Sequence, residues 1–292
     1  MTPKLGAEVP ETTTTPERNF DSHVHSEWSW DAAEGSMLAT CRRAMDLGWK
    51  GLAFTEHSDH TPVSGAAQLD VAGYFTSLER CRSLFPSLDI RSGVELGEPH
   101  RFPAESTALL TAAPFDLVLG SVHCVPIGGE LVDLSRLGRD LRLTAEFVVQ
   151  SYLSEVMALI AGPVPFAVLA HLEYFKRYWP SHWAPYRASD HEEHIRSLLS
   201  ATLDRGTVLE VNTSAGLATE RGLCPGPELL RWWRELGGRE VSLGSDAHSP
   251  DRLGAGFPEA LELLSRLGLR VARGHFRAGR ASTTAHRNAP RG

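Results

Sequence analysis

The sequence predicts one α/β domain in which parallel strands form a closed or nearly closed barrel surrounded by helices. Short runs rich in β-forming residues alternate with helix-length segments along the chain. Seven such repeats imply parallel pairing of the strands, and this alternation over 292 residues is typical of a barrel folded as a single domain. An open, doubly wound sheet is the alternative prediction from the same pattern.

The predicted strands are short β-rich runs that end in a polar or acidic residue. They cover residues 19–25, 51–55, 90–95, 117–120, 167–170, 207–211 and 241–243. The helix-length segments are closed by Gly or Pro, which disfavour continuation of a helix. They cover residues 36–47, 71–84, 144–160, 189–203, 227–236 and 258–267.

Both ends of the chain have a different composition. Residues 1–18 are rich in Thr, Pro and Glu without an apolar period, and residues 274–292 mix Arg, Ala, Thr and Pro. Such segments bury too little surface to order themselves, so we expect two disordered tails around a domain at 19–273. Neither end carries a signal peptide or a membrane-length apolar run, which predicts a cytoplasmic protein without a membrane partner.

The net charge and the spacing of the cysteines restrict the kinds of ligand and metal site that the chain can be expected to have. The net charge is −7 and the basic residues form no long run, so the sequence favours a small substrate over nucleic acid. The four cysteines, at positions 41, 81, 124 and 224, show no C-x-x-C spacing. We therefore predict buried free thiols rather than disulfides or a thiolate zinc site.

The first predicted strand ends in Asp21-Ser-His23-Val-His25. Because side chains alternate along a strand, His23 and His25 lie on the same face and could share one ion. A single His-x-His pair is weak evidence, since the same spacing also occurs on ordinary surface strands.

Further candidate ligands lie at or after the ends of the first and of other predicted strands, where a barrel places its active site. They are Asp31, His57, Glu95, His123, His171, Asp246 and His248. Nine imidazole and carboxylate residues over six strand ends would be costly to bury unless cations bind them. Ligands of this kind without thiolate suit zinc, manganese or iron, and Glu95 could bridge two ions. A barrel mouth with hydrogen-bonded histidines and no metal is the simpler alternative.

Six motifs of the chain, in their order, resemble those of the polymerase and histidinol phosphatase (PHP) family. They are D-S-H-V-H-S, F-T-E-H, G-V-E, G-S-V-H, A-H and G-S-D-A-H. The resemblance covers residues 20–269 and implies a distorted seven-stranded (β/α) barrel, TIM-like, with two to three divalent metal ions. In the implied ligand sets, the first ion takes His23, His25, Glu95 and Asp246; the second takes Glu95, His123 and His171; the third takes Asp31, His57 and His248.

The amidohydrolases, another barrel family, also begin with His-x-His and end with a strand-terminal Asp. Their binuclear members commonly bridge two metals with a carbamylated lysine at a strand end. Here Lys50 precedes a strand and Lys176 lies five residues beyond His171, so neither lysine fits that role. Mononuclear amidohydrolases would leave Glu95 and His123 unexplained as a set.

The resemblance implies a phosphoric monoester hydrolase of the histidinol-phosphatase branch, which acts in histidine biosynthesis. Divalent ions make hydroxide available near neutral pH and offset the charge of a phosphoester, and we assign no general acid. Another small phosphate ester is an alternative substrate. A phosphodiesterase or exonuclease would need a basic groove, and a non-enzymatic module would not need an intact ligand set.

Substrate contacts are less clearly marked in the sequence. Arg177 and Arg252 follow strands near the predicted mouth, and Arg221 is a third candidate phosphate contact. Trp28 and Trp30 follow the first ligand pair and are candidate pocket residues. Barrel-rim packing is the expectation for most of the other aromatic residues of this set, which are Tyr174, Tyr178, Trp179 and Trp183. The Gly-rich segment 126–142 lies beside His123, and whether it closes over substrate as a lid is left open.

Overall fold

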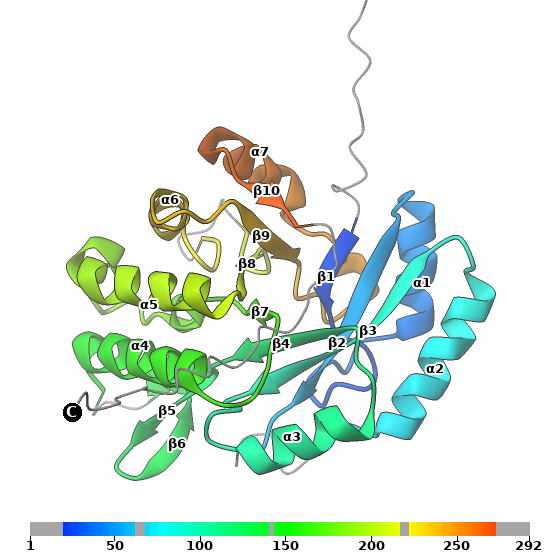
Figure 1. Cartoon of the computed structure of the whole chain (residues 1–292), viewed down its shortest axis with the longest axis horizontal. Coiled ribbons are helices and arrows are strands. Elements are labelled where there is room, and N and C mark those ends of the chain that lie inside the picture. The colour runs from blue at the N-terminus through cyan, green and yellow to red at the C-terminus, as the bar shows by residue number, and fades with distance from the viewer. Residues whose placement is uncertain (1–19, 62–67, 140–142, 217–221, 273–292) are drawn as a thin grey trace, which may run out of the picture.

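Eight parallel strands form the central sheet of the molecule (Figure 1). The structure is a computed structural model that describes residues 20–61, 68–139, 143–216 and 222–272. The strand order β1-β2-β3-β4-β7-β8-β9-β10 follows the chain. The strands are β1 (Phe20–Val24), β2 (Gly51–Ser58), β3 (Asp89–Gly97), β4 (Leu117–Ser121), β7 (Val168–Leu169), β8 (Val208–Asn212), β9 (Glu240–Gly244) and β10 (Arg270–Val271).

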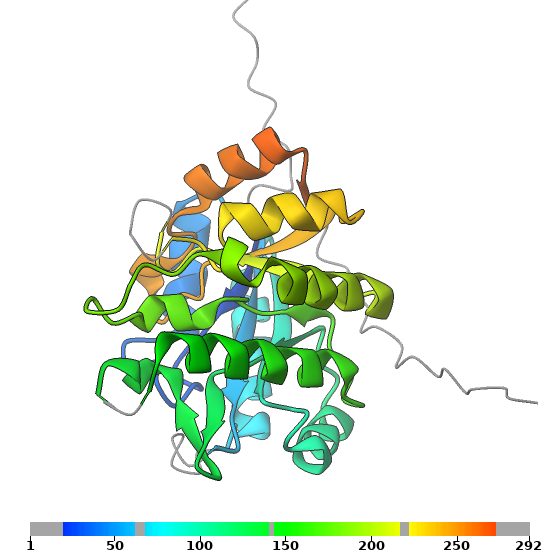
Figure 2. The same cartoon turned by 90° about the vertical axis from the view of Figure 1, so that its left-hand side faces the viewer.

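Seven α-helices lie outside the strands within the described residues. They are α1 (Met37–Asp46), α2 (Val71–Leu84), α3 (Pro103–Ala112), α4 (Ala145–Ala161), α5 (Glu192–Arg205), α6 (Pro227–Glu235) and α7 (Phe257–Leu267). Local sequence sets several ends: Ser36 and Thr144 cap the first turns of α1 and α4, and Gly206 ends α5 at a φ of 74°. Figure 2 shows α4 to α7 stacked over one flank of the strands.

The first strand meets the end of β9 and so curls the sheet into a barrel. The amide of Asp246 donates to the carbonyl of His23 at 2.8 Å, and the amide of His25 donates to the carbonyl of Ala247 at 2.9 Å. The hydroxyl of Ser22 donates to the carbonyl of Leu243 at 2.7 Å. The predicted distorted TIM-like barrel in a single α/β domain is therefore confirmed, and the open doubly wound alternative is excluded.

All seven predicted strands are present, but several other elements were not predicted. The segment after β4 forms an antiparallel hairpin of β5 (Cys124–Ile127) and β6 (Glu130–Asp133), followed by a 3-10 helix at Leu134–Arg139. The pair Gly128 and Gly129, with φ of 61° and 92°, makes its turn, which is a recognised hairpin signal. Helix α3 and the two-residue β10 were also missed. The hairpin and 3-10 helix fill most of the segment considered as a lid.

The buried apolar side chains form three clusters between the helices and the strands. One core cluster joins α4 to α7 to the strands, a second joins α1 and α2 to β1, β2 and β3, and a third consists of strand residues such as Leu119 and Val168. All four cysteines are buried free thiols, as predicted. In the described part of the chain no helix has the length and apolar character of a membrane span. The expected tails, 1–18 and 274–292, lie outside the described residues.

Candidate metal centre

The candidate ligands from the strand ends gather at one end of the barrel. They lie on or after β1, β2, β3, β4, β7 and β9, close to the carboxyl end of each strand. Because parallel strands all finish at the same end of a barrel, residues far apart in the sequence meet there. The candidates are His23, His25, Asp31, His57, Glu95, His123, His171, Asp246 and His248, and six of them are buried, with Asp31, His123 and His248 more accessible.

One carboxylate oxygen of Glu95 faces the His-x-His pair. Glu95 Oε2 lies 3.0 Å from His23 Nε2 and 3.4 Å from His25 Nε2. Asp246 Oδ1 lies 3.6 Å and 3.3 Å from the same two ring nitrogens. The structure thus brings together the four residues that the family resemblance implies for the first ion.

The other oxygen of Glu95 faces a second pair of imidazoles. Glu95 Oε1 lies 2.7 Å from His171 Nε2 and 3.1 Å from His123 Nε2, and these two nitrogens are 3.3 Å apart. The three residues of the second implied set therefore also converge. Glu95 lies between the two groups, which is the position that a bridging carboxylate requires.

The third implied set lies closer to solvent. Asp31 Oδ2 is 3.1 Å from His248 Nε2 and 3.4 Å from His57 Nε2. The side chain of Asp31 is 30% exposed and that of His248 is 34% exposed. The rings of His25 and His248 have centroids 4.4 Å apart, so this group adjoins the first one.

Asp59 belongs to this cluster and was missed by the sequence reasoning. Its carboxylate lies 3.4 Å from His57 Nδ1 and 3.5 Å from His123 Nδ1, and Trp30 Nε1 donates to it at 2.9 Å. A Cβ at Gly97 would lie 1.9 Å from Asp59 Oδ1, so this glycine gives the carboxylate its space. The available signal was the spacing of two residues after His57, the same alternation that pairs His23 with His25.

Buried polar residues hold the imidazoles from behind. His23 Nδ1 donates to Glu210 Oε1 at 2.7 Å, which leaves Nε2 as the nitrogen that faces Glu95. Glu210 Oε2 accepts the amide of His171 at 2.7 Å. The Ser29 hydroxyl lies 2.9 Å from His25 Nδ1. These supports fix the direction of the rings, and they did not stand out in the sequence because carboxylates in mid-strand carry no motif.

The electrostatics of the cluster favour added positive charge. Burial alone would raise the pKa of Glu95, but the neighbouring histidines, His23 first, hold it well below its usual range. Burial alone would lower the pKa of His57, yet the carboxylates of Asp59 and Glu95 raise it to about 10. Carboxylates at this density therefore stabilise either protons on the imidazoles or metal cations in their place.

The donor chemistry fits metal ions. Ring nitrogens face each other at 3.0 Å between His23 and His25 and at 3.3 Å between His123 and His171. Two unprotonated nitrogens at such distances repel each other, and a cation bound by both lone pairs removes the repulsion. Within the described residues, every group of three donors that could hold an ion consists of His, Asp or Glu. Such a cluster is a candidate metal centre with hard and borderline ligands.

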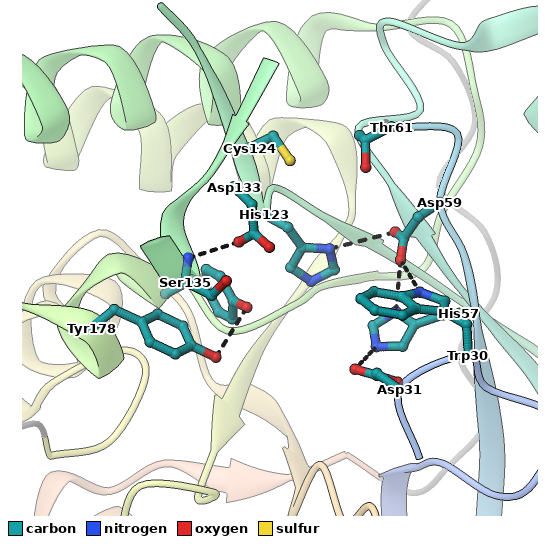
Figure 3. A pocket seen from close by; sticks show the side chains of 11 residues that line it. Trp30, Asp31, His57, Asp59, Thr61, His123, Cys124, Asp133, Ser135 and Tyr178 are labelled. Carbon is teal, nitrogen blue, oxygen red and sulfur yellow. Dashed lines mark hydrogen bonds and ion pairs between the residues drawn. The ribbon is translucent and has the colours of Figure 1, made fainter. Parts of the chain in front are cut away.

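A pocket of about 170 Å³ opens beside the cluster (Figure 3). The candidate ligands Asp31, His57 and His123 line one part of it. The remaining lining residues come from the loops after β1 and β2, from the β5–β6 hairpin and the 3-10 helix that follows it, and from the turn after β7; they include Trp30, Asp59, Asp133, Ser135, Tyr174 and Tyr178. A ligand in this pocket would contact the cluster and the hairpin at the same time.

The candidate substrate contacts fall into different places. Trp30 lines the pocket and is 43% exposed, whereas Trp28 packs toward α2, where its ring blocks any Cβ at Gly73. Arg177 forms an ion pair with Asp246 at 2.8 Å and donates to Asn212 Oδ1 at 2.7 Å.

Two further arginines complete the candidate set. Arg252 donates to the carbonyl of Ser214 at 2.9 Å and does not line the pocket. Arg221 lies outside the described residues.

Tyr174 and Tyr178, for which rim packing was expected, line the pocket instead.

Proteins with a similar sequence are named for one activity. A probable histidinol-phosphatase from Clostridium acetobutylicum is 28% identical over 256 residues, which cover 86% of this chain and 94% of that protein. A histidinol-phosphatase from Lactococcus lactis is 26% identical over 254 residues, covering 86% of this chain and 92% of that protein.

A solved structure has the same fold. The crystal structure of histidinol phosphate phosphatase from Lactococcus lactis, complexed with zinc, L-histidinol and phosphate, superposes with a TM-score of 0.77 at 25% identity. The match covers 90% of this chain and 97% of that one. A model of the PHP domain matches residues 21–214, the part of the barrel that carries all the candidate ligands except Asp246 and His248. With more than half of its length matched, the chain belongs to the PHP family.

Proposed function

We propose that this PHP hydrolase is a metal-dependent phosphomonoesterase that converts L-histidinol phosphate and water to L-histidinol and phosphate, a step of histidine biosynthesis. The observation that carries the proposal is the Glu95 carboxylate placed between two pairs of imidazoles beside an open pocket. The relatives named histidinol-phosphatase support the choice of substrate.

The proposed cofactor is two to three divalent ions of zinc, manganese or iron. The ligand sets are His23, His25, Glu95 and Asp246 for the first ion, Glu95, His123 and His171 for the second, and Asp31, His57 and His248 for the third. Zinc is the ion named in the complex of the Lactococcus lactis phosphatase. Asp59 lies against His57 and His123 and is an additional carboxylate candidate at the last two sets.

Divalent ions bound by this cluster would make hydroxide available near neutral pH and offset the negative charge of a phosphoryl group. The chain's own residues position the reaction. Glu210 and Ser29 hold the rings of His23 and His25. Arg177 places a guanidinium against Asp246 and holds this ligand of the first ion. We also propose that it contacts the phosphoryl oxygens, which guanidinium groups recognise well, although it does not line the pocket described above.

The pocket gives the ester a defined orientation. Its phosphate end would lie against Asp31, His57 and His123, and the organic part would lie toward Tyr174 and Tyr178.

The test compares phosphate release from L-histidinol phosphate, p-nitrophenyl phosphate and a bis-aryl phosphodiester. We expect the highest kcat/KM with L-histidinol phosphate and a loss of roughly a hundredfold or more in Glu95→Gln, because a bridging ligand should matter at least as much as its supporting residues. Glu105→Gln, at an exposed position on α3, is the matched control and should retain wild-type activity.

Other results would contradict the proposal in different ways. Preference for the diester would replace the monoesterase assignment with a phosphodiesterase. Turnover of the aryl phosphate without turnover of L-histidinol phosphate would reject the substrate and keep the hydrolase class. Full activity in Glu95→Gln would reject the site.

A further inference from the structure

The β5–β6 hairpin places an acidic side chain in the lining of the pocket, beside the candidate metal ligand His123. Asp133, the last residue of β6, pairs with Cys124, the first residue of β5, and Cys124 directly follows His123. The amide of Leu134 donates to the carbonyl of His123 at 2.9 Å. The register of the hairpin therefore fixes Asp133 beside the cluster (Figure 3).

The carboxylate of Asp133 differs from the other carboxylates of the pocket. Asp31 and Asp59 each lie within ion-pairing distance of two histidines. Asp133 Oδ1 accepts only the amide of Ser135, at 2.7 Å, and no Lys, Arg or His among the described residues forms an ion pair with it. Its side chain is partly buried. A partly desolvated carboxylate without a protein cation is suited to a cationic ligand.

Aromatic rings line the pocket next to this carboxylate. Tyr174 and Tyr178 lie with ring centroids 5.4 Å apart in an edge-to-face arrangement, and their hydroxyls are 3.3 Å apart. The ring of Tyr174 is also 5.0 Å from the ring of His123. His123, the two tyrosines and Asp133 therefore line the same pocket. An aromatic ring beside a carboxylate is a common means of binding an organic cation, and Tyr178 supplies the ring here, because the guanidinium of Arg177 already lies 5.0 Å from the centroid of the Tyr174 ring.

We propose that Asp133 recognises a positively charged nitrogen of the substrate, so that the enzyme selects phosphate monoesters that carry an ammonium or imidazolium group. This inference rests on the proposed function for the position of the phosphate, which lies against the metal ligands. Asp133 determines specificity and takes no part in the hydrolytic step. Removal of its charge therefore weakens discrimination among esters.

The first experiment measures selectivity in the metal-loaded enzyme. The ratio of kcat/KM for L-histidinol phosphate to that for p-nitrophenyl phosphate, which has no cationic nitrogen, falls about tenfold or more in Asp133→Asn. Asp133→Glu keeps the charge and recovers part of the ratio. Glu130→Gln, an exposed change on the same strand, is the matched control and leaves the ratio unchanged. An unchanged ratio in Asp133→Asn, or the same loss with both esters, would overturn the proposal.

The second experiment uses binding without turnover. Calorimetry of the metal-loaded protein with L-histidinol should show about a tenfold weaker affinity in Asp133→Asn, with a much smaller change for inorganic phosphate. Equal affinity for L-histidinol in wild type and variant would contradict the role of Asp133, as would a lower metal content in the variant. If the wild type hydrolyses no ester, the proposed function fails, and this binding experiment still decides whether Asp133 holds the cation.

Discussion

The imidazole of His23 is held at both ring nitrogens, and Glu210 makes the contact that the sequence does not reveal. Glu210 Oε1 accepts from His23 Nδ1, while Oε2 accepts the amide of His171, so one buried carboxylate on β8 supports the ends of both β1 and β7. A Cβ at Gly244 would lie 2.3 Å from Glu210 Oε1, so the glycine at the end of β9 leaves space for this support. A carboxylate behind a ligating imidazole increases its basicity and fixes its tautomer.

The variant Glu210→Gln tests this support at the scale of one residue. We expect the metal affinity to fall about 10- to 100-fold, because the amide can still accept a hydrogen bond but no longer carries charge. Activity should recover at high metal concentration. Titration of the apoprotein with zinc measures the affinity, and Glu193→Gln on α5 is an exposed control. A metal affinity within about twofold of wild type would show that Glu210 has only a structural role.

At the scale of elements, hydrogen bonds and ion pairs attach helix α4 to the turn after β3. Glu155 and His100 of this partly buried group are largely covered, and Arg101 is about one-third exposed. Glu155 of α4 accepts hydrogen bonds from Arg101 at 2.5 Å and 2.6 Å and lies 2.8 Å from His100 Nε2. Burial alone would raise the pKa of Glu155, but these hydrogen bonds lower it from 4.5 to about 2. Since β3 carries Glu95, this group ties the outer helix to the strand at the centre of the site.

The pKa shift of Glu155 predicts how stability depends on pH. A carboxyl group with a lowered pKa in the folded state contributes stability above its unfolded pKa, near 4.5, and loses that contribution as pH falls toward 2. We expect Glu155→Gln to lower the free energy of unfolding by about 2 kcal/mol at pH 7. Urea unfolding should show that the difference from wild type shrinks between pH 5 and pH 3.5. A difference that is constant over this range, or as large in Glu146→Gln on the same helix, would contradict the assignment.

The elements missed from the sequence share a physical cause. Helix α3 fully buries only Ser106, so it has no apolar stripe for a periodicity argument to find. Strand β10 has two residues, and the four-residue strands β5 and β6 are too short to show alternation. The Gly-Gly pair at 128–129 was the one local signal for the hairpin. Amphipathic helices and buried strands were predicted because their burial repeats at a fixed period.

Over the whole molecule, the convergence of the candidate ligands follows from the barrel topology. Nine donors could be found from the sequence because they share one rule, a position at or just after a strand end. Asp133 and Arg177 could not be assigned contacts in this way. Their partners depend on the register of the hairpin and on the path of the chain after β7, which only the folded molecule defines.

The most direct test of the central claim is metal titration of the chelated apoprotein, followed by bound metal, phosphate release from L-histidinol phosphate and the thermal unfolding midpoint. The account predicts that two to three equivalents of zinc or manganese bind, that activity appears with this occupancy, and that the midpoint rises because the ions bind only the folded state. Full activity in the metal-free protein, or no bound metal at saturating concentrations, would contradict it.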